Sequence, residues 1–294
     1  MNVTFEKYHG LGNDYLVCDP AINQLDLTPS RIRLICDRNR GVGSDGILFG
    51  PITAANKVAV RIFNPDGSEA EKSGNGVRIF AKYLFDSGRI KDGRLMLSTL
   101  GGDVEVDYLN ADGSLMRVFM GRATFVSGDI PVSGPPRSVV DEPMRFANEE
   151  HRVTCVSVGN PHCVIPLPDI SREKAETLGP IVETAPYFPN RINMQLLKVL
   201  DRCNIAIEIF ERGAGYTLAS GSSSCAAACA ARRLGLVDSE VTVHMPGGTL
   251  RIEIGDDYSV HMTGDATRVG TFRAAEEFVL KLQSLDLNHD GSTG

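Results

Sequence analysis

An α+β protein of two similar domains is predicted by two segments of the sequence that repeat one pattern. Each segment begins with a Phe, at Phe63 and Phe210, and has a Ser-Gly pair ten residues later, at Ser73 and Ser220. Small polar residues follow each pair, and an apolar, helix-favouring segment comes next, over 77–86 and 225–234. Two copies of one strand–turn–helix unit predict two domains of similar build.

Strand and turn patterns in both halves agree with this fold class. Alternating apolar residues, separated by turn-forming Gly, Asn and Asp, predict many short strands, and further helices are predicted at 28–39 and 169–178. A sheet curled around a helix, twice, is the simplest way to bury both apolar helices of the repeat. The predicted strands are 3–8, 15–18, 47–49, 58–63, 94–99, 103–108, 115–120, 152–158, 163–165, 192–197, 204–210, 241–245, 249–254 and 259–263.

The domain boundary is expected near 128–142, where the chain becomes rich in Pro, Ser and Gly and predicts an irregular crossover. We therefore assign 1–125 to an N-terminal domain and 126–264 to a C-terminal domain. A strand near 265–275 is expected to complete the N-terminal domain. The polar segment 286–294 is expected to be a flexible tail.

Composition excludes several classes of partner. The net charge is -7, with no Lys/Arg run, which argues against a nucleic-acid surface. No apolar run approaches the roughly 20 residues that a membrane span needs. The start of the chain lacks the basic end and apolar middle of a signal peptide. We expect a cytoplasmic protein that binds neither nucleic acid nor membrane.

The cysteines predict neither a disulfide framework nor a metal site. There are seven, an odd number, and no CxxC pair occurs. Most have apolar neighbours, so we expect reduced cysteines that pack in the core. No Cys/His ligand set with metal-binding spacing is present, so no metal is expected.

The repeated turn predicts an anion site in each domain. A Ser-Gly pair that opens a helix puts unpaired backbone N–H groups and the positive end of the helix dipole at one point. Two such sites could hold one carboxylate from two directions. The alternative is that Ser73 and Ser220 are ordinary N-cap residues. The matched pair and its polar surroundings favour the anion sites.

Other polar residues fall at strand ends or in tight turns. Each alone is more typical of a turn-former or a satisfied surface group than of a ligand contact. Seven such polar residues around two candidate anion sites are harder to explain as turn-formers or surface groups alone. They are Asn13, Asn64, Asn160, His162, Asn193, Glu211 and Arg212.

Seven motifs in order make the chain resemble the diaminopimelate epimerase family almost from end to end. A set of this length in register is very specific. The motifs are Lys7–Tyr15, Arg40–Gly46, Phe63–Arg78, Gly159–His162, Arg191–Asn193, Glu211–Gly215 and Met262–Ala266.

The resemblance implies a cofactor-free isomerase that converts LL-diaminopimelate to meso-diaminopimelate in lysine and cell-wall precursor synthesis. It implies two pseudo-symmetric domains, each a barrel-like, mostly antiparallel sheet around a central helix, with the active site in the interdomain cleft. In such enzymes one cysteine thiolate removes the α-proton and a second thiol returns a proton from the opposite face. A thiol suits this task because a helix N-terminus can lower its pKa toward neutrality.

The resemblance also implies a role for each candidate residue. The positions of the two catalytic cysteines are those of Ser73 and Ser220, and His162 and Glu211 match their polar partners. The backbone donors for the reacting carboxylate match Gly74, Asn75, Gly221 and Ser222. The far amino-acid end of the substrate matches Asn64, Asn160, Asn193 and Arg212, and the substrate-binding set also includes Asn13 and Glu211.

The sequence departs from the family pattern at the decisive positions. A serine hydroxyl is far less acidic than a thiol, so Ser73 and Ser220 predict a chain with little or no epimerase activity. Because the surrounding motifs are intact, our hypothesis is an engineered double Cys→Ser form that holds substrate without turnover. Smaller departures are Tyr216 for an expected Glu, Cys163 after the Asn-Pro-His turn, and Asp265 for an expected Pro.

Two alternatives stay open at this point. Tyr216 favours a racemase of the same scaffold, independent of pyridoxal phosphate, that acts on another amino acid such as histidine. Naturally occurring serines would favour a non-catalytic protein that binds an amino acid. All three interpretations imply a small-molecule amino-acid ligand, and a homodimer is compatible with each.

Overall fold

The chain forms two units in a computed structural model that describes residues 3–54, 57–71, 73–91 and 93–287. Unit 1 comprises Met1–Met116 and Asp265–Gly294, and unit 2 comprises Arg117–Gly264. The chain enters unit 2 within strand β8 (Leu115–Arg122) and leaves it near the end of β17 (Ser259–Asp265).

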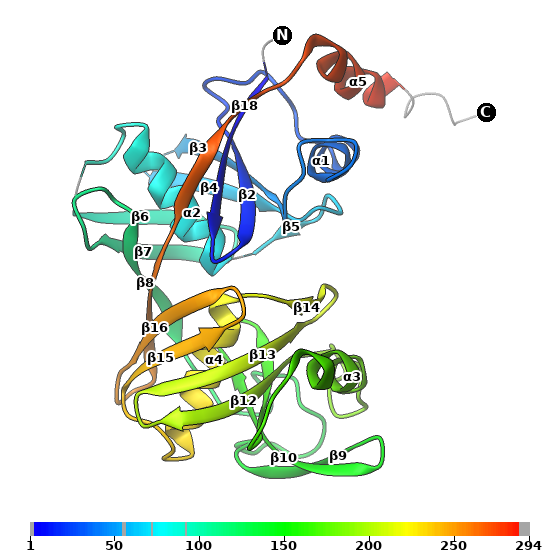
Figure 1. Cartoon of the computed structure of the whole chain (residues 1–294), viewed down its shortest axis with the longest axis vertical. Helices are drawn as coiled ribbons and strands as arrows, with labels where there is room; N and C mark the ends of the chain where they lie inside the picture. Colours follow the sequence, from blue (N-terminus) through cyan, green and yellow to red (C-terminus); the bar gives the residue numbers. More distant parts are fainter. Residues whose placement is uncertain (1–2, 55–56, 72, 92, 288–294) are drawn as a thin grey trace. The chain divides into compact units, whose positions relative to one another are not determined.

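Unit 1 contains a mostly antiparallel sheet and one buried helix (Figure 1). Its further elements are β1 (Thr4–Gly10), β2 (Asn13–Cys18), α1 (Pro29–Cys36), β3 (Ile47–Ala54), β4 (Lys57–Phe63), β5 (Glu69–Ala70), α2 (Gly74–Asp86), β6 (Arg94–Thr99), β7 (Gly102–Tyr108), β18 (Thr267–Arg273) and α5 (Glu276–Leu287). Strand β1 pairs antiparallel with both β2 and β18, while β2–β3 and β4–β6 are parallel pairs. Helix α2 packs against β1, β2, β7 and β18.

Unit 2 repeats this arrangement around helix α4 (Figure 1). Its elements are β9 (Glu142–Phe146), β10 (Glu149–Ser157), β11 (Pro161–Pro166), α3 (Arg172–Glu183), β12 (Asn193–Asp201), β13 (Asn204–Glu211), β14 (Gly215–Thr217), α4 (Gly221–Arg233), β15 (Glu240–Met245), β16 (Gly248–Ile254) and β17. The pairs β11–β12 and β13–β15 are parallel, as are their counterparts in unit 1. Helix α4 packs against every strand from β10 to β13 and against β15 and β16.

The predicted internal repeat extends to the register of the strands. In unit 1, β4 turns back into β5 and Phe63 pairs with Glu69. In unit 2, β13 turns back into β14 and Phe210 pairs with Tyr216. The paired residue follows the Phe by the same number of positions in both copies. The predicted α+β class, with two units of one topology and mostly antiparallel sheets around a central helix, is confirmed.

Burial on nearly every side explains why these two helices are apolar around most of their circumference. Residues 77–81 of α2 and 223–231 of α4 are buried throughout. The exception in α2 is Arg78, which is fully buried. Its guanidinium donates to the Asn75 side chain at 2.8 Å and to the backbone oxygens of Gly74 and Asp265. These bonds replace the water that the buried cation has lost.

Several elements differ from the sequence prediction. The strands β5 and β14 were not predicted, because segments of two or three residues carry little alternation. Strand β9 was not predicted because it contains Pro143 and directly follows the Pro-rich segment. Helix α5 was also missed, and it includes positions 286 and 287 of the predicted tail, while 288–294 lie outside the described residues. Helix α1 ends at Cys36, earlier than the predicted 39.

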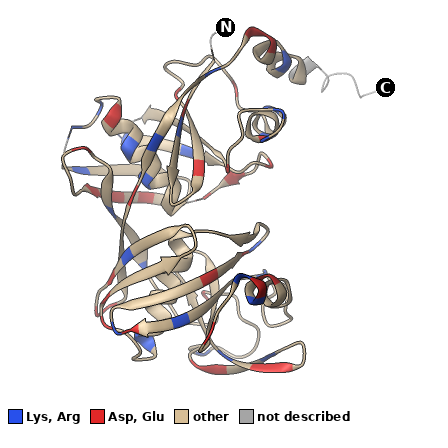
Figure 2. Ribbon diagram, in the orientation of Figure 1, with Lys and Arg blue, Asp and Glu red and all other residues tan. Residues whose placement is uncertain are grey.

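The distribution of charged residues and the burial of the cysteines agree with what the sequence predicts. Acidic and basic residues are interspersed along the strands of each unit (Figure 2). None of the described helices is long and apolar enough to cross a bilayer. Six cysteines are buried, as predicted for core residues, and Cys203 is exposed.

The contact between α3 and β13 predicts a destabilising substitution. A Cβ added at Gly179 would lie 2.2 Å from the Phe210 ring, so Gly179→Ala forces the ring or the helix to move. We expect a loss of about 2 kcal/mol in the free energy of unfolding, measured by urea denaturation. Gly128→Ala is the control, because nothing lies within 4 Å of its added Cβ. Equal stability of the two variants would contradict this packing.

Candidate functional site

Ser73 caps helix α2 and leaves two backbone donors free. Its Oγ accepts a hydrogen bond from the Gly76 N–H at 3.1 Å and lies 3.3 Å from the Tyr15 hydroxyl. The N–H groups of Gly74 and Asn75 have no acceptor among the described residues. With the positive end of the helix dipole, these donors form a site that can bind an anion.

Two asparagine side chains lie together beside this helix start. Asn75 donates to the Oδ1 of Asn13 at 3.1 Å and accepts from buried Arg78. Asn13 in turn donates to Asp45 at 2.9 Å. The structure therefore brings Asn13 and Asn75 together with the Ser73 turn. Asn64 is separate, because its side chain donates to Ser68 in the turn after β4.

Ser220 caps helix α4 in the same way. Its Oγ accepts from the Ser223 N–H at 3.4 Å and lies 3.5 Å from the Ser222 hydroxyl. The N–H groups of Gly221 and Ser222 find no acceptor in the described part of the chain. Each unit thus has two free backbone donors directly after a capping serine.

His162 and Asn160 connect β11 to the start of α4. Asn160 donates to the Ser222 Oγ at 3.3 Å, and its Oδ1 lies 2.9 Å from the His162 Nε2. His162 is fully buried. Burial lowers the pKa of this imidazole to about 3, and the nearby Arg212 charge also lowers it. The ring is therefore neutral at physiological pH, and it can orient Asn160 without adding a charge.

Glu211 is the acid that lies next to Ser220. Burial raises the pKa of the Glu211 carboxyl, and contacts with the hydroxyl groups of Ser220 and Thr217 partly oppose this shift. A hydroxyl beside a carboxylate has a partner that can take its proton. Ser73 differs, since the contact recorded for its hydroxyl is the Tyr15 phenol, a much weaker base.

Asn193 and Arg212 form a second contact close to His162. The Asn193 Oδ1 accepts from the Arg212 N–H at 2.9 Å, and its amide donates to the Pro161 oxygen. Asn193 pairs with His162 across β11 and β12. The Arg212 side chain is exposed and donates to the Asn190 oxygen. Its guanidinium keeps further donors for a ligand.

Tyr216 lies away from Ser220. It pairs with Phe210, whereas Glu211 pairs with Gly215, so alternation puts Tyr216 and Glu211 on opposite faces of the β13–β14 hairpin. The Tyr216 hydroxyl donates to Glu208, and Arg172 of α3 stacks on its ring. This position does not support the expectation that Tyr216 favours another amino-acid substrate.

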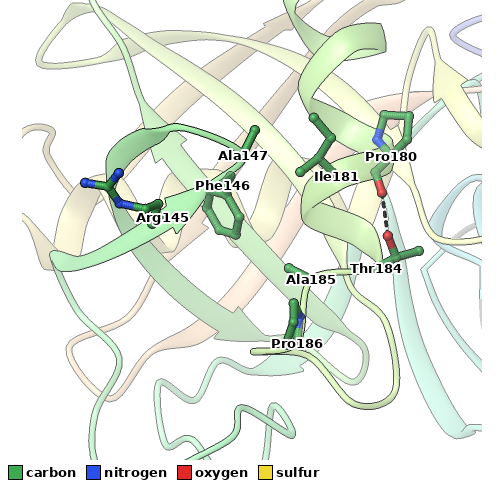
Figure 3. A pocket seen from close by; sticks show the side chains of 8 residues that line it. All are labelled: Arg145, Phe146, Ala147, Pro180, Ile181, Thr184, Ala185 and Pro186. Atoms are coloured by element: carbon green, nitrogen blue, oxygen red, sulfur yellow. Dashed lines mark hydrogen bonds between the residues drawn. The ribbon is translucent and has the colours of Figure 1, made fainter.

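One cavity of unit 2 lies apart from Ser220. This cavity of about 400 Å³ is mainly apolar and lies between the end of β9 and the end of α3 (Figure 3). It contains none of the candidate residues. Its lining residues are Arg145, Phe146, Ala147, Pro180, Ile181, Thr184, Ala185 and Pro186.

Three residues around the serines were missed in the sequence. Tyr15 contacts Ser73, while Gln195 donates to Ser223 at 3.0 Å behind Ser220. A signal existed for two of them. Tyr15 follows Asn13 at strand spacing, and Gln195 follows Asn193 at the same spacing in an otherwise apolar strand. Ser223 had no such signal.

None of the cysteines stands at a helix cap. Burial raises the pKa of the Cys18 thiol to about 12 and also raises those of Cys36 and Cys229. The pKa of the Cys155 thiol is raised by its contact with Cys163 and by burial. Such thiols stay protonated at neutral pH, and they lack the environment that activates a cysteine. None of these thiols can therefore serve as the proton-transferring base in place of Ser73 or Ser220.

Comparison with known proteins identifies relatives of the chain. Residues 5–126 and 154–269 match the profile of the diaminopimelate epimerase family. Diaminopimelate epimerase 2 of Nostoc sp. is 54% identical over 267 residues, covering 90% of this chain and 93% of that protein. The diaminopimelate epimerase of Pelotomaculum thermopropionicum is 41% identical over 270 residues, covering 90% and 96%.

Two solved structures share the fold at low sequence identity. A probable proline racemase from Agrobacterium radiobacter superposes with a TM-score of 0.69 at 14% identity, covering 93% of both chains. A hydroxyproline epimerase from Agrobacterium vitis gives 0.68 at 14% identity, covering 93% of this chain and 91% of that one.

The raised pKa of Glu211 predicts how stability depends on pH. A carboxyl whose pKa is raised in the folded state stabilises the fold most fully below its unfolded pKa of about 4.3. That contribution is lost as the pH rises through the folded-state pKa. We expect Glu211→Gln to gain stability relative to the unaltered chain at neutral pH, and this gain to shrink toward about pH 4.

Urea denaturation across this pH range checks the prediction. Glu150→Gln, at an exposed position of β10, is the control and should show no such trend. A Glu211→Gln advantage that grows as the pH falls would mean that the pKa of Glu211 is lowered by folding.

Proposed function

Because the chain belongs to the diaminopimelate epimerase family, we propose that each of its two serine-capped helix starts takes part in binding an amino acid. The observation that supports this most directly is the pair of free N–H groups in each unit. They belong to Gly74 and Asn75 in unit 1, and to Gly221 and Ser222 in unit 2. Four such donors suit the carboxylate of an amino acid.

The substrate we propose is diaminopimelate, which has a second amino-acid group at its far end. Such a group needs both a cation and neutral acceptors. Arg212 supplies an exposed guanidinium, and Asn193 lies in direct contact with its backbone. Asn160 and Asn64 add neutral polar groups. The names of the relatives point to the same substrate.

The reaction of this scaffold is proposed to be transfer of the α-proton between two bases on opposite faces of the carbon. Ser73 and Ser220 take the positions of those bases, with His162 and Glu211 as their polar partners. Glu211 contacts the hydroxyl of Ser220, whereas the Ser73 hydroxyl lies 3.3 Å from the Tyr15 phenol, a much weaker base than a carboxylate. A hydroxyl without a strong base is a poor acceptor for an α-proton.

The chain as it stands is therefore proposed to bind diaminopimelate with little or no turnover. An inactivated double Cys→Ser form explains the serines most simply, since the motifs around them match the family pattern. A natural protein that binds an amino acid without catalysis is the alternative. The histidine racemase is favoured less, because Tyr216 packs against α3 on the face of the hairpin opposite Glu211.

Restoring both thiols tests the assignment of the two bases. We expect Ser73→Cys with Ser220→Cys to exchange the α-proton of LL-diaminopimelate in D2O at least about 1000-fold faster than the unaltered chain. Loss of the α-proton signal by NMR measures this. Each single cysteine variant is a matched control and should form little meso-diaminopimelate, because inversion needs a proton acceptor on one face of the α-carbon and a donor on the other, whereas exchange with retention needs only one base.

Two results would contradict the assignment of Ser73 and Ser220 as the positions of the two bases. If the unaltered chain exchanges the proton as fast as the double cysteine variant, serine is a competent base here. If no variant exchanges it while diaminopimelate still binds, the two positions are not the catalytic pair.

Arg212 provides a test of the substrate. L-Lysine resembles diaminopimelate without the second carboxylate, so Arg212→Met should weaken diaminopimelate binding by about 10- to 100-fold and leave lysine binding nearly unchanged. Isothermal titration calorimetry measures both. Arg145→Met is the control, because that arginine lines the separate apolar cavity of unit 2. An equal loss for both ligands would assign Arg212 to the shared end of the two molecules.

A further inference from the structure

A closed ring of polar contacts lies at the start of helix α4. Going around it, Ser220 contacts Ser222, Ser222 accepts from Asn160, and Asn160 contacts His162. Gln195 then contacts His162 and Ser223, and the Ser223 N–H donates back to Ser220. We call these six residues the polar ring. It joins α4 to strands β11 and β12 through side chains.

Two buried atoms of the polar ring lack a partner. They are the Nδ1 of His162 and the Oε1 of Gln195. The two side chains lie on one face of neighbouring strands, because His162 of β11 pairs with Asn193 and Gln195 follows Asn193 by two residues along β12, and they interact there. Both residues are fully buried, so water does not reach these atoms easily. An unsatisfied buried polar atom is costly, and two adjacent ones have a common cause.

The hydrogen bonds of Asn160 determine which imidazole nitrogen carries the proton. Its amide N–H donates to Ser222, so its Oδ1 faces His162 and must accept. The His162 Nε2 is then the protonated nitrogen, and the Nδ1 of the neutral ring is an acceptor. An acceptor that faces the Gln195 Oε1 cannot form a hydrogen bond with it.

A half-turn of the Gln195 amide satisfies both atoms. The Nε2 then donates to the His162 Nδ1, and the Oε1 accepts the hydroxyl proton of Ser223. Both groups remain in the positions already described, because the amide oxygen and nitrogen have nearly the same size. Every member of the polar ring then has a partner of the right kind.

We propose that Gln195 is a positioning residue: its amide N–H donates to the Nδ1 of His162 and fixes the Nε2–H tautomer that orients Asn160. Through Asn160 and Ser223, it holds Ser222 and Ser220 in place at the start of α4. Only its effect on ligand binding rests on the proposed function. The proton arrangement itself belongs to the folded chain.

NMR of the unaltered chain tests the proton arrangement directly. We expect His162 to carry its proton on Nε2, and a nitrogen–nitrogen coupling across the hydrogen bond between Gln195 Nε2 and His162 Nδ1. His244, whose Nε2 lies 2.9 Å from the Asn204 Oδ1, is the internal reference for an imidazole without a glutamine neighbour. A proton on His162 Nδ1, or no coupling to Gln195, overturns the proposal.

Gln195→Glu tests the consequence, because a carboxylate has the same shape and cannot donate. We expect His162 to gain a proton on Nδ1, and diaminopimelate binding to weaken by about tenfold. Gln283→Glu, an exposed position in α5, adds the same charge and should change neither property. An unchanged His162 in the folded Gln195→Glu variant contradicts the proposal, and if this variant does not fold, the coupling in the unaltered chain decides.

The same experiments give a different result if the proposed function is wrong and the role of Gln195 is right. In that case the unaltered chain does not bind diaminopimelate, yet His162 still shows the Nε2 proton and the coupling to Gln195. Binding that is the same in the unaltered chain and in Gln195→Glu, despite the changed protonation of His162, leaves Gln195 a structural residue and overturns its positioning role.

Discussion

The organisation of both units follows from one constraint, the free backbone N–H groups at the start of a buried helix. A helix that is covered on nearly all sides still leaves its first N–H groups without partners inside the helix. Ser73 and Ser220 each satisfy one of these groups with a side-chain oxygen. In each helix, the N–H groups of the two residues between the serine and this capped group stay available. A carboxylate is the natural group to accept hydrogen bonds from them.

The surroundings of each helix start are polar for the same reason. Asn13 and Asn75 lie beside the first, and the polar ring lies behind the second. The two sides are not equivalent, however. Ser220 contacts an acid whose pKa is raised by burial, and Ser73 contacts a phenol. The pseudo-repeat of the backbone thus carries different chemistry in its two copies.

Much of the fold could be predicted because the repeat is visible in the sequence. The Phe-to-Ser spacing predicted α2 and α4 and the strands before them, and the structure has both helices beginning directly after the serines. The short strands β5 and β14 were invisible, since two or three residues show no periodicity. Helix α5 was missed because its apolar and polar residues show only weak helical periodicity.

The candidate residues were predictable as a set, and their contacts were not. Asn13 with Asn75, and Asn160 with His162, form pairs in the structure, whereas Asn64 bonds within its own turn. Gln195 was missed because one polar residue in an apolar strand has many explanations. Its meaning depends on partners distant in the sequence, which only the fold brings together.

The central claim is that the serine-capped start of each helix takes part in binding the amino-acid ligand. Titration of LL-diaminopimelate into the unaltered, 15N-labelled chain tests it through the amide signals of Gly74, Asn75, Gly221 and Ser222. We predict that all four signals shift along one binding curve with a single dissociation constant. Shifts confined to one helix start, or two curves with different constants, would contradict the account.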